Sequence, residues 1–296
     1  MKLKLTPGLL AQYGLAVFFM LLFSLPLLFM FSSSLKDPQT IFADVKSWRA
    51  FFPVGDVSLD QYFGVFERLP LWQFMFNSIF ISATVVILGL FVNSLAGYAI
   101  ARLKFKGQNV ILIFLIATLV IPFETIAMPL LVLVNSLPRI SFEDGTIEFT
   151  TGWLNTYLVQ IAPFVAWGFS IFLFVQYFKT IPKELDEAAV IDGASFFSIY
   201  WRIIVPLAGP AFATSAILSF LAIWNAYLWP VMVVQTEALR PVQVGLDYFF
   251  AATSEDGTAW GEIMAYSTLI TLPIVIIFVI FQRAFVASVA SSGVKG

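Results

Sequence analysis

The chain has 296 residues, of which 60% are hydrophobic and only 11% are charged, and its net charge at pH 7 is −2. Soluble domains carry roughly 25% charged residues, so this composition excludes an ordinary soluble domain and favours a chain covered by a bilayer. The absence of cysteine and histidine excludes disulfides, thiol catalysis, most zinc sites and histidine-assisted nucleophiles, and no basic run points to nucleic acid.

Six segments are long and apolar enough to span a membrane, which takes about 20 residues. The first is longer than the apolar region of a signal peptide, about 7–15 residues, so we expect an uncleaved span there. The sequence therefore predicts an all-α integral membrane protein with six transmembrane helices in one membrane domain, residues 1–296. The predicted spans cover residues 11–34, 72–101, 109–136, 155–178, 210–235 and 263–282.

The positions of Lys and Arg predict the orientation of these spans. Basic residues gather in the short segments at the two ends of the chain and after the second and fourth spans, and Arg102, Lys104 and Lys106 form the densest cluster. Because cytoplasmic loops are enriched in Lys and Arg, both termini and the loop at 179–209 are predicted to be cytoplasmic. The first outer loop, about residues 36–71, is amphipathic and lies either at the membrane interface or in solvent with aromatic anchors.

Several predicted spans contain proline, which frees backbone carbonyls that neighbouring groups must satisfy. Glu124, the one ionisable residue inside a predicted span, follows Pro122 closely and so lies near such a break. A carboxylate at this depth either lines a pathway or gate, or bonds a freed backbone group or a neighbouring protein. The sequence leaves both readings open.

The loop at 179–209 is the one extended polar segment between two apolar spans on the predicted cytoplasmic side. Carboxylates in the first turns favour a helix there, Gly193 favours its left-handed end, and Ser195 is a suitable N-cap for a second short helix. The predicted helix–glycine turn–helix would present small side chains for close approach by a partner, namely Ala188, Ala189, Gly193 and Ala194. Glu187 and Asp192 would add hydrogen-bond acceptors.

This loop resembles the EAA motif of ABC importer permeases. The motif reads Glu-Ala-Ala, three residues, Gly, nine residues, Ile, two residues, Pro, and the matching positions are Glu187, Ala188, Ala189, Gly193, Ile203 and Pro206. The family usually has Leu immediately before that proline, where this chain has Val205. The resemblance implies the type I importer fold and a coupling loop that docks onto a cytoplasmic ATPase.

Further segments resemble the carbohydrate-uptake permeases of the maltose type, and among them the six-span MalG-like subunit. They are Asn77-Ser78 and residues 98–107, 224–230 and 292–296, so the resemblance covers nearly the whole chain. Family members usually carry Glu after Trp-Asn, and Ala226 stands there in this chain.

What the resemblance implies is a subunit without catalysis of its own. A second homologous permease would complete the pathway for a carbohydrate, two ATPase subunits would bind ATP and Mg²⁺, and an extracytoplasmic solute-binding protein would deliver the sugar. The complex would lie in the bacterial cytoplasmic membrane. The chain lacks the G-x-x-x-x-G-K-[ST] signature of a phosphate-binding loop, so we expect it to bind no cofactor or metal itself.

Two further sets of residues are candidates for contacts with the cargo and its receptor. Trp224, Asn225 and Tyr227 suit a sugar path, although amides and aromatic residues in spans more often serve packing and anchoring. Asp247 and Glu255, in the third outer loop, are placed against the binding protein by analogy with the family.

Other functions remain as alternatives. Within the family, the solute could be a glycerophosphodiester or a polyol. A secondary transporter or channel acting alone would not need the docking loop, and a membrane enzyme ranks last because the chain lacks His, Cys and paired intramembrane carboxylates.

Overall fold

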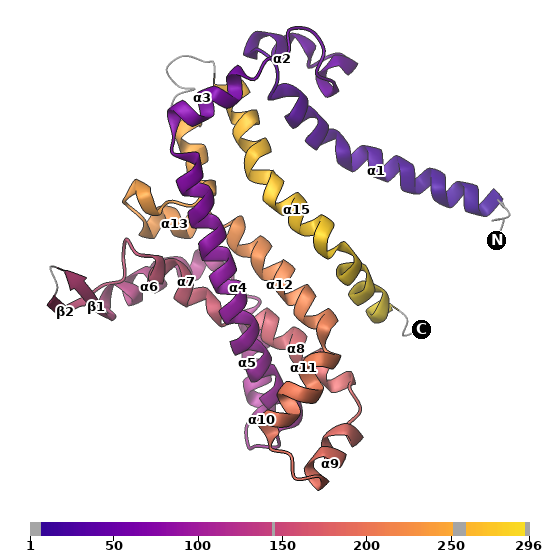
Figure 1. Ribbon diagram of the computed structural model, residues 1–296, viewed down its shortest axis with the longest axis vertical. Coiled ribbons are helices and arrows are strands. Elements are labelled where there is room, and N and C mark those ends of the chain that lie inside the picture. Colours follow the sequence, from indigo (N-terminus) through magenta and orange to yellow (C-terminus); the bar gives the residue numbers. More distant parts are fainter. Residues whose placement is uncertain (1–6, 144–145, 251–258, 294–296) are drawn as a thin grey trace. The chain divides into compact units, whose positions relative to one another are not determined.

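The computed structural model describes residues 7–143, 146–250 and 259–293. The chain divides into two compact units, and each is described by itself. The first unit comprises Met1–Leu71 and Gly245–Pro273, and the second comprises Trp72–Val244 and Ile274–Gly296. Helices dominate both units, as the sequence predicts, and Figure 1 labels them in chain order.

The first unit consists of helices joined by short irregular connections. Its helices are α1 (Pro7–Ser33), α2 (Pro38–Asp44), the 3₁₀ helix η1 (Trp48–Phe51), α3 (Asp60–Arg68) and the first part of α15 (Trp260–Gly293). Lys36 is 1% exposed, and its Nζ donates to Asp44 Oδ2 at 2.9 Å and to the Arg49 carbonyl at 2.6 Å. This buried ion pair fixes α2 and η1 beside the end of α1.

The aromatic residues of the first outer loop behave as an amphipathic surface within this unit. Phe42, Trp48, Phe52 and Phe63 all expose more than half of their surface, while Ile41 and Val65 are buried. Their position at the membrane interface, rather than in solvent, stays a prediction.

The second unit begins with α4 (Leu71–Arg102) and continues through a series of shorter helices. They are α5 (Gln108–Thr118), α6 (Phe123–Ser136), α7 (Tyr157–Val165), α8 (Gly168–Thr180), α9 (Glu184–Ile191), α10 (Phe196–Ile199), the π-helical turn η2 (Tyr200–Ile204), α11 (Val205–Leu207), α12 (Gly209–Trp224), α13 (Leu228–Val233), and the 3₁₀ turns η3 (Glu237–Leu239) and η4 (Val242–Gly245).

One predicted span is bent, and a second bend lies immediately before another predicted span. Residues 109–136 form α5 and α6, which meet at an angle of 106°, and the helical segment Phe196–Leu207 meets α12 at 80°. Pro122 explains the first break, because proline cannot donate the hydrogen bond that would continue α5 into α6. Four described helices are long and apolar enough to cross a membrane, and up to six if each bent pair is one span.

One described element departs from the predicted helical pattern. An antiparallel hairpin joins β1 (Pro138–Glu143) to β2 (Thr146–Thr151), with Pro138 opposite Thr151, and lies between α6 and α7 (Figure 1). The sequence carried the signal, because Ile, Phe and Thr flank an Asp-Gly pair, which is typical of two-residue hairpin turns.

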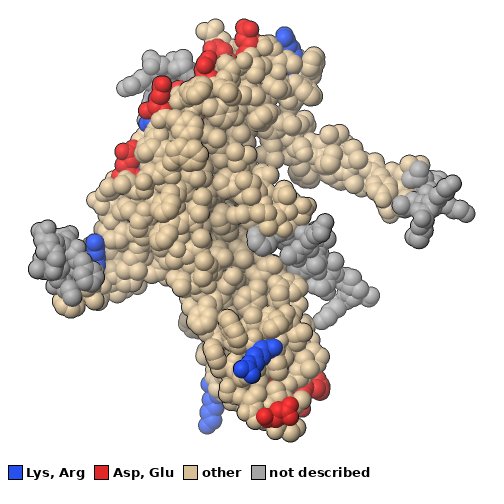
Figure 2. All heavy atoms as spheres, viewed as in Figure 1, with Lys and Arg blue, Asp and Glu red and all other residues tan. Residues whose placement is uncertain are grey.

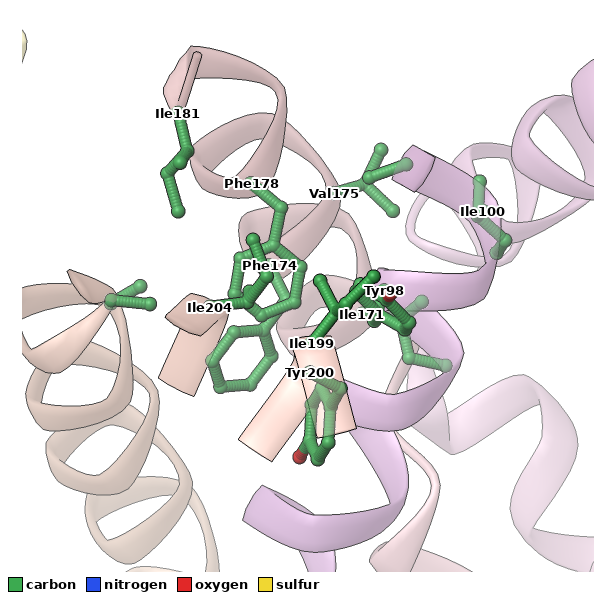
Figure 3. Close-up of a cluster of buried hydrophobic side chains, with 13 residues drawn as sticks. Tyr98, Ile100, Ile171, Phe174, Val175, Phe178, Ile181, Ile199, Tyr200 and Ile204 are labelled. Atoms are coloured by element: carbon green, nitrogen blue, oxygen red, sulfur yellow. The ribbon is translucent and has the colours of Figure 1, made fainter. Parts of the chain in front are cut away.

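The main core of the second unit lies where α4, α8 and the segment from α10 to α12 meet. It contains large side chains such as Phe174, Phe178, Tyr200 and Ile204, all at most 1% exposed (Figure 3). Gly97 permits close packing of α4 on α8, because a Cβ added there would lie 2.6 Å from the Cβ of Phe174.

A substitution at Gly97 tests this packing. We expect Gly97→Ala to lower the free energy of unfolding by about 1–3 kcal/mol, since the added methyl group overpacks the contact between α4 and α8. The measurement is thermal unfolding of the purified protein in detergent. Gly209→Ala is the matched control, because an added Cβ there meets nothing within 4 Å, and an equal loss in both variants would contradict the prediction.

Candidate functional site

The candidate site is the loop between α8 and α12, which the sequence predicted as a coupling loop. Its first helix, α9, carries Glu184, Asp186 and Glu187 in the first turn, where carboxylates favour the positive end of the helix dipole. Helix α9 ends in a Schellman motif, since Gly193 N–H donates to the Val190 carbonyl at 3.0 Å and Ala194 N–H to the Ala189 carbonyl at 2.9 Å. The predicted left-handed end at Gly193 is confirmed, with φ +79°.

The second helical segment of the loop begins at a confirmed N-cap. The Ser195 hydroxyl accepts from the Ser198 N–H at 3.3 Å, and the helix continues through the π turn into α11. Tyr200 and Ile204 point into the core and are at most 1% exposed, while Phe196, Phe197 and Trp201 expose more than half of their surface. One side of the segment therefore holds the loop to the unit and the other remains apolar and uncovered.

The exposed surface of α9 combines apolar and acidic side chains. Ile191 is 85% exposed and Val190 51%, and Glu184, Glu187 and Asp192 are exposed around them. Acidic atoms accordingly gather over α9 in Figure 2. We call this set, with Ala188 and Gly193, the α9 surface. It offers a partner an apolar centre with acceptors at its rim.

The remaining motif residues lie differently from the sequence expectation. Ala189 and Ala194 are half-buried and pack against the chain's own core, as does Ile203, so their small or apolar side chains serve internal packing. Pro206 is exposed near the bend that precedes α12. A role for any of these residues in contact with a partner stays a prediction.

Three side chains of α4 hold the loop in place. Ser94, Tyr98 and Arg102 are spaced four residues apart and so share one face of the helix. The Ser94 and Tyr200 hydroxyls are 2.7 Å apart, and the Tyr98 hydroxyl donates to the Phe196 carbonyl at 3.1 Å. These bonds fix the second helical segment against α4.

Arg102 fixes the start of the loop. Its side chain is only 2% exposed, and Nη2 donates to the Ile181 carbonyl at 2.7 Å while Nη1 lies 3.5 Å from Asp186 Oδ2. Burial raises the pKa of the Asp186 carboxyl above its ordinary value, and the positive charge of Arg102 opposes that rise. The sequence analysis used Arg102 for orientation and for the family resemblance and did not predict that it holds the loop, although its four-residue spacing from Tyr98 places both on one helix face.

The four candidate pathway residues differ in their burial and in their surroundings. Glu124 is exposed in the first turn of α6, and Trp224 is 1% exposed, as expected for a packing residue. Asn225 ends α12 and donates to the Leu221 carbonyl at 2.8 Å, and Tyr227 is 45% exposed. Their role in a pathway stays a prediction.

The second unit contains a cavity of about 620 Å³, lined by the break between α5 and α6, by the residues between α7 and α8, and by α12. Its described lining is mainly apolar, with Thr118 and Ser219 among the few polar side chains, and none of the four candidate residues belongs to it. Of the two candidate residues in the predicted third outer loop, Asp247 is half-buried in the first unit. Glu255 lies outside the described residues.

Comparison with known proteins identifies the family. Residues 93–291 match the family described as "Binding-protein-dependent transport system inner membrane component". The chain is 35% identical over 246 residues to the arabinooligosaccharides transport system permease protein AraQ of Halalkalibacterium halodurans, covering 83% of this chain and 82% of that protein. It is 34% identical over 224 residues to the trehalose/maltose transport system permease protein MalG of Thermococcus litoralis, covering 74% of each.

The fold agrees with a solved structure. A bacterial ABC transporter involved in the import of the acidic polysaccharide alginate matches with a TM-score of 0.73 and 22% identity, covering 96% of this chain and 100% of that chain. The chain therefore belongs to the family of binding-protein-dependent transport permeases, has the type I ABC importer permease fold, and is a multi-pass membrane protein.

Replacing Arg102 tests how the loop is held. We expect Arg102→Met to increase amide hydrogen exchange in residues 181–200 by about tenfold or more, because hydrogen bonds to charged groups contribute about 1.5–3 kcal/mol. The measurement is hydrogen–deuterium exchange with mass spectrometry in detergent. Lys104→Met removes an exposed charge two residues away and should leave exchange unchanged. Unchanged exchange in both variants would mean that Arg102 does not hold the loop.

Proposed function

We propose that this chain is the transmembrane permease subunit of an ATP-driven importer of sugars or oligosaccharides. The observation that carries the proposal is the α9 surface, an apolar patch with an acidic rim on a loop whose backbone is held by α4. A loop that is fixed internally but apolar outwardly suits a docking contact, because it loses little conformational entropy on binding. The ATPase on which it docks binds ATP and Mg²⁺ and hydrolyses the ATP, and the chain itself is not an enzyme.

The partners follow from the same proposal. A second, homologous permease completes the translocation pathway, two ATPase subunits bind on the cytoplasmic side, and an extracytoplasmic binding protein delivers the solute. Support comes from the family description, which names dependence on a binding protein and an inner membrane component. The chain lies in the bacterial cytoplasmic membrane with both termini and the α9 surface in the cytoplasm.

A charge placed at the centre of the α9 surface tests docking. We expect Ile191→Glu to abolish co-purification of the ATPase, because a carboxylate would be desolvated in the contact while the 85% exposed position tolerates it in the free chain. Lys106→Glu, on an exposed residue of the neighbouring loop, is the matched control and should co-purify normally. Retention of the ATPase by Ile191→Glu would contradict docking at this surface.

A second variant separates the shape of the loop from its surface. Gly193 has φ +79°, and an added Cβ there meets nothing of this chain within 4 Å, so in the free chain a substitution acts through backbone strain. We expect Gly193→Val to weaken ATPase association by more than Gly193→Asn, because Asn tolerates left-handed geometry and a β-branched residue does not. Association is measured by pull-down of the ATPase from detergent-solubilised membranes. Equal effects of the two substitutions would contradict a requirement for the Schellman end.

Solute class is tested by transport. Support for a carbohydrate comes from the relatives, whose names refer to arabino-oligosaccharides and to trehalose and maltose. Proteoliposomes that contain the complete complex and its binding protein should accumulate labelled oligosaccharide in an ATP-dependent manner. Uptake of a glycerophosphodiester or a polyol without uptake of any sugar would replace carbohydrate as the solute class and leave the permease assignment intact.

A further inference from the structure

Helix α4 contains two buried Asn–Ser pairs that the docking site leaves unexplained. Asn77 and Ser78 lie near its start, and Asn93 and Ser94 lie sixteen residues later, all of them at most 2% exposed. The helix runs for 32 residues without a proline. Buried amides in apolar surroundings are costly unless they are fully hydrogen-bonded, so the partners of these pairs indicate their use.

The first pair holds a segment on the predicted outer side. The Asn77 amide donates to the carbonyls of Ala238 and Arg240, each at 2.9 Å, and its oxygen accepts from the Tyr157 hydroxyl at 2.6 Å. The Ser78 hydroxyl accepts from the Val242 N–H at 2.8 Å. We call residues 238–242 the outer segment. Every one of its bonds to this pair is made through its backbone, so the contact fixes the path of the chain.

In the second pair, Asn93 bonds to the segment between α7 and α8, and Ser94 bonds to the loop between α8 and α12 on the predicted cytoplasmic side, which we call the docking loop. The Asn93 amide donates to the Val165 carbonyl at 3.1 Å and its oxygen accepts from the Trp167 N–H at 3.0 Å, which bridges the break between α7 and α8. Ser94 pairs with Tyr200 of the docking loop. Together with Tyr98 and Arg102, this end of α4 binds the loop at several separate points.

One continuous helix, α4, thus joins the outer segment to the docking loop between α8 and α12, which carries the α9 surface. Asn77 and Arg102 are 25 residues apart, about 37 Å along the helix axis at 1.5 Å per residue, enough to cross the hydrocarbon core. Two other helical connections of this unit bend, by 106° between α5 and α6 and by 80° before α12. A displacement at one end of α4 is therefore carried to the other end, because no break in the helix absorbs it.

We propose that α4 transmits the engagement of the outer segment to the α9 surface, with Asn77 as the positioning residue at the outer end. This inference rests on the proposed function, because it assumes a binding protein outside and an ATPase inside. Asn77 contacts neither partner. It fixes the backbone of the outer segment to the helix, so that a load on that segment moves the docking loop.

The test compares basal and stimulated ATP hydrolysis in the complete complex. We expect Asn77→Ala and the isosteric Asn77→Asp to assemble with the ATPase and keep basal hydrolysis, while stimulation by the solute-loaded binding protein falls at least about fivefold, the lower end of usual coupling between sites. Asp keeps the acceptor for Tyr157 and loses both donors to the outer segment. Asn109→Ala, on an exposed residue of α5, is the control and should be stimulated normally.

A second variant interrupts the helix without touching either end. Ile87 is 68% exposed in the middle of α4, and Ile87→Pro would break the helix there, whereas Ile87→Ala would not. Stimulation should fall in the proline variant and persist in the alanine variant, with the ATPase bound in both.

The outcomes separate this inference from the proposed function. A wild-type complex that neither binds an ATPase nor responds to a binding protein would overturn the proposed function. Normal stimulation of the Asn77 and Ile87→Pro variants would overturn transmission through α4 and leave the proposed function intact. Parallel loss of basal and stimulated hydrolysis, or failure of the Asn77 variants to assemble, would make Asn77 a structural residue and overturn the inference as well.

Discussion

Hydrogen bonding of backbone groups that helix breaks set free is the constraint on which the second unit depends. A bilayer offers no water to a freed carbonyl or N–H, so each break needs a polar side chain nearby. At the break between α7 and α8, the side chain of Asn93 satisfies both a free carbonyl and a free N–H. Its amide nitrogen donates to the Val165 carbonyl, and its amide oxygen accepts from the Trp167 N–H. With these groups satisfied, α7 and α8 can pack as two helices at apolar depth, and the core around Phe174 and Phe178 can close on α4.

The same logic explains why α4 is straight while its neighbours are bent. The side chains of α4 form hydrogen bonds with backbone groups that are free at the breaks of other helices. To hold those side chains in place, α4 must keep its own backbone hydrogen bonds, and it contains no proline. Gly97 lies between Asn93 and Arg102 and lets α8 approach α4 closely, because an added Cβ there would lie 2.6 Å from the Cβ of Phe174. Small residues and polar side chains are what drive helix association where the hydrophobic effect is absent.

The sequence predicted features whose cause is local and missed features whose cause is tertiary. Ser195 as an N-cap and Gly193 as a left-handed end depend on a few neighbouring residues, and both are confirmed. The bend at Pro122 was visible as a helix breaker, although its angle depends on what packs beside it. The hairpin was missed because the apolar, spanning character of the chain outweighed a local Asp-Gly signal. The inward positions of Ala189 and Ala194 depend on the core they meet, which no spacing rule supplies.

Arg102 shows how one residue serves two physical requirements. As a cation at the end of α4 it favours cytoplasmic placement of that end, and a solvated lysine would meet that need equally well. Its burial at 2% exposure requires more, because a desolvated charge must be matched by acceptors. The planar guanidinium donates to the Ile181 carbonyl through Nη2 and places Nη1 3.5 Å from the Asp186 carboxylate, so its two ends meet two different groups. The same side chain therefore contributes to the predicted orientation and attaches the loop between α8 and α12 to the end of α4.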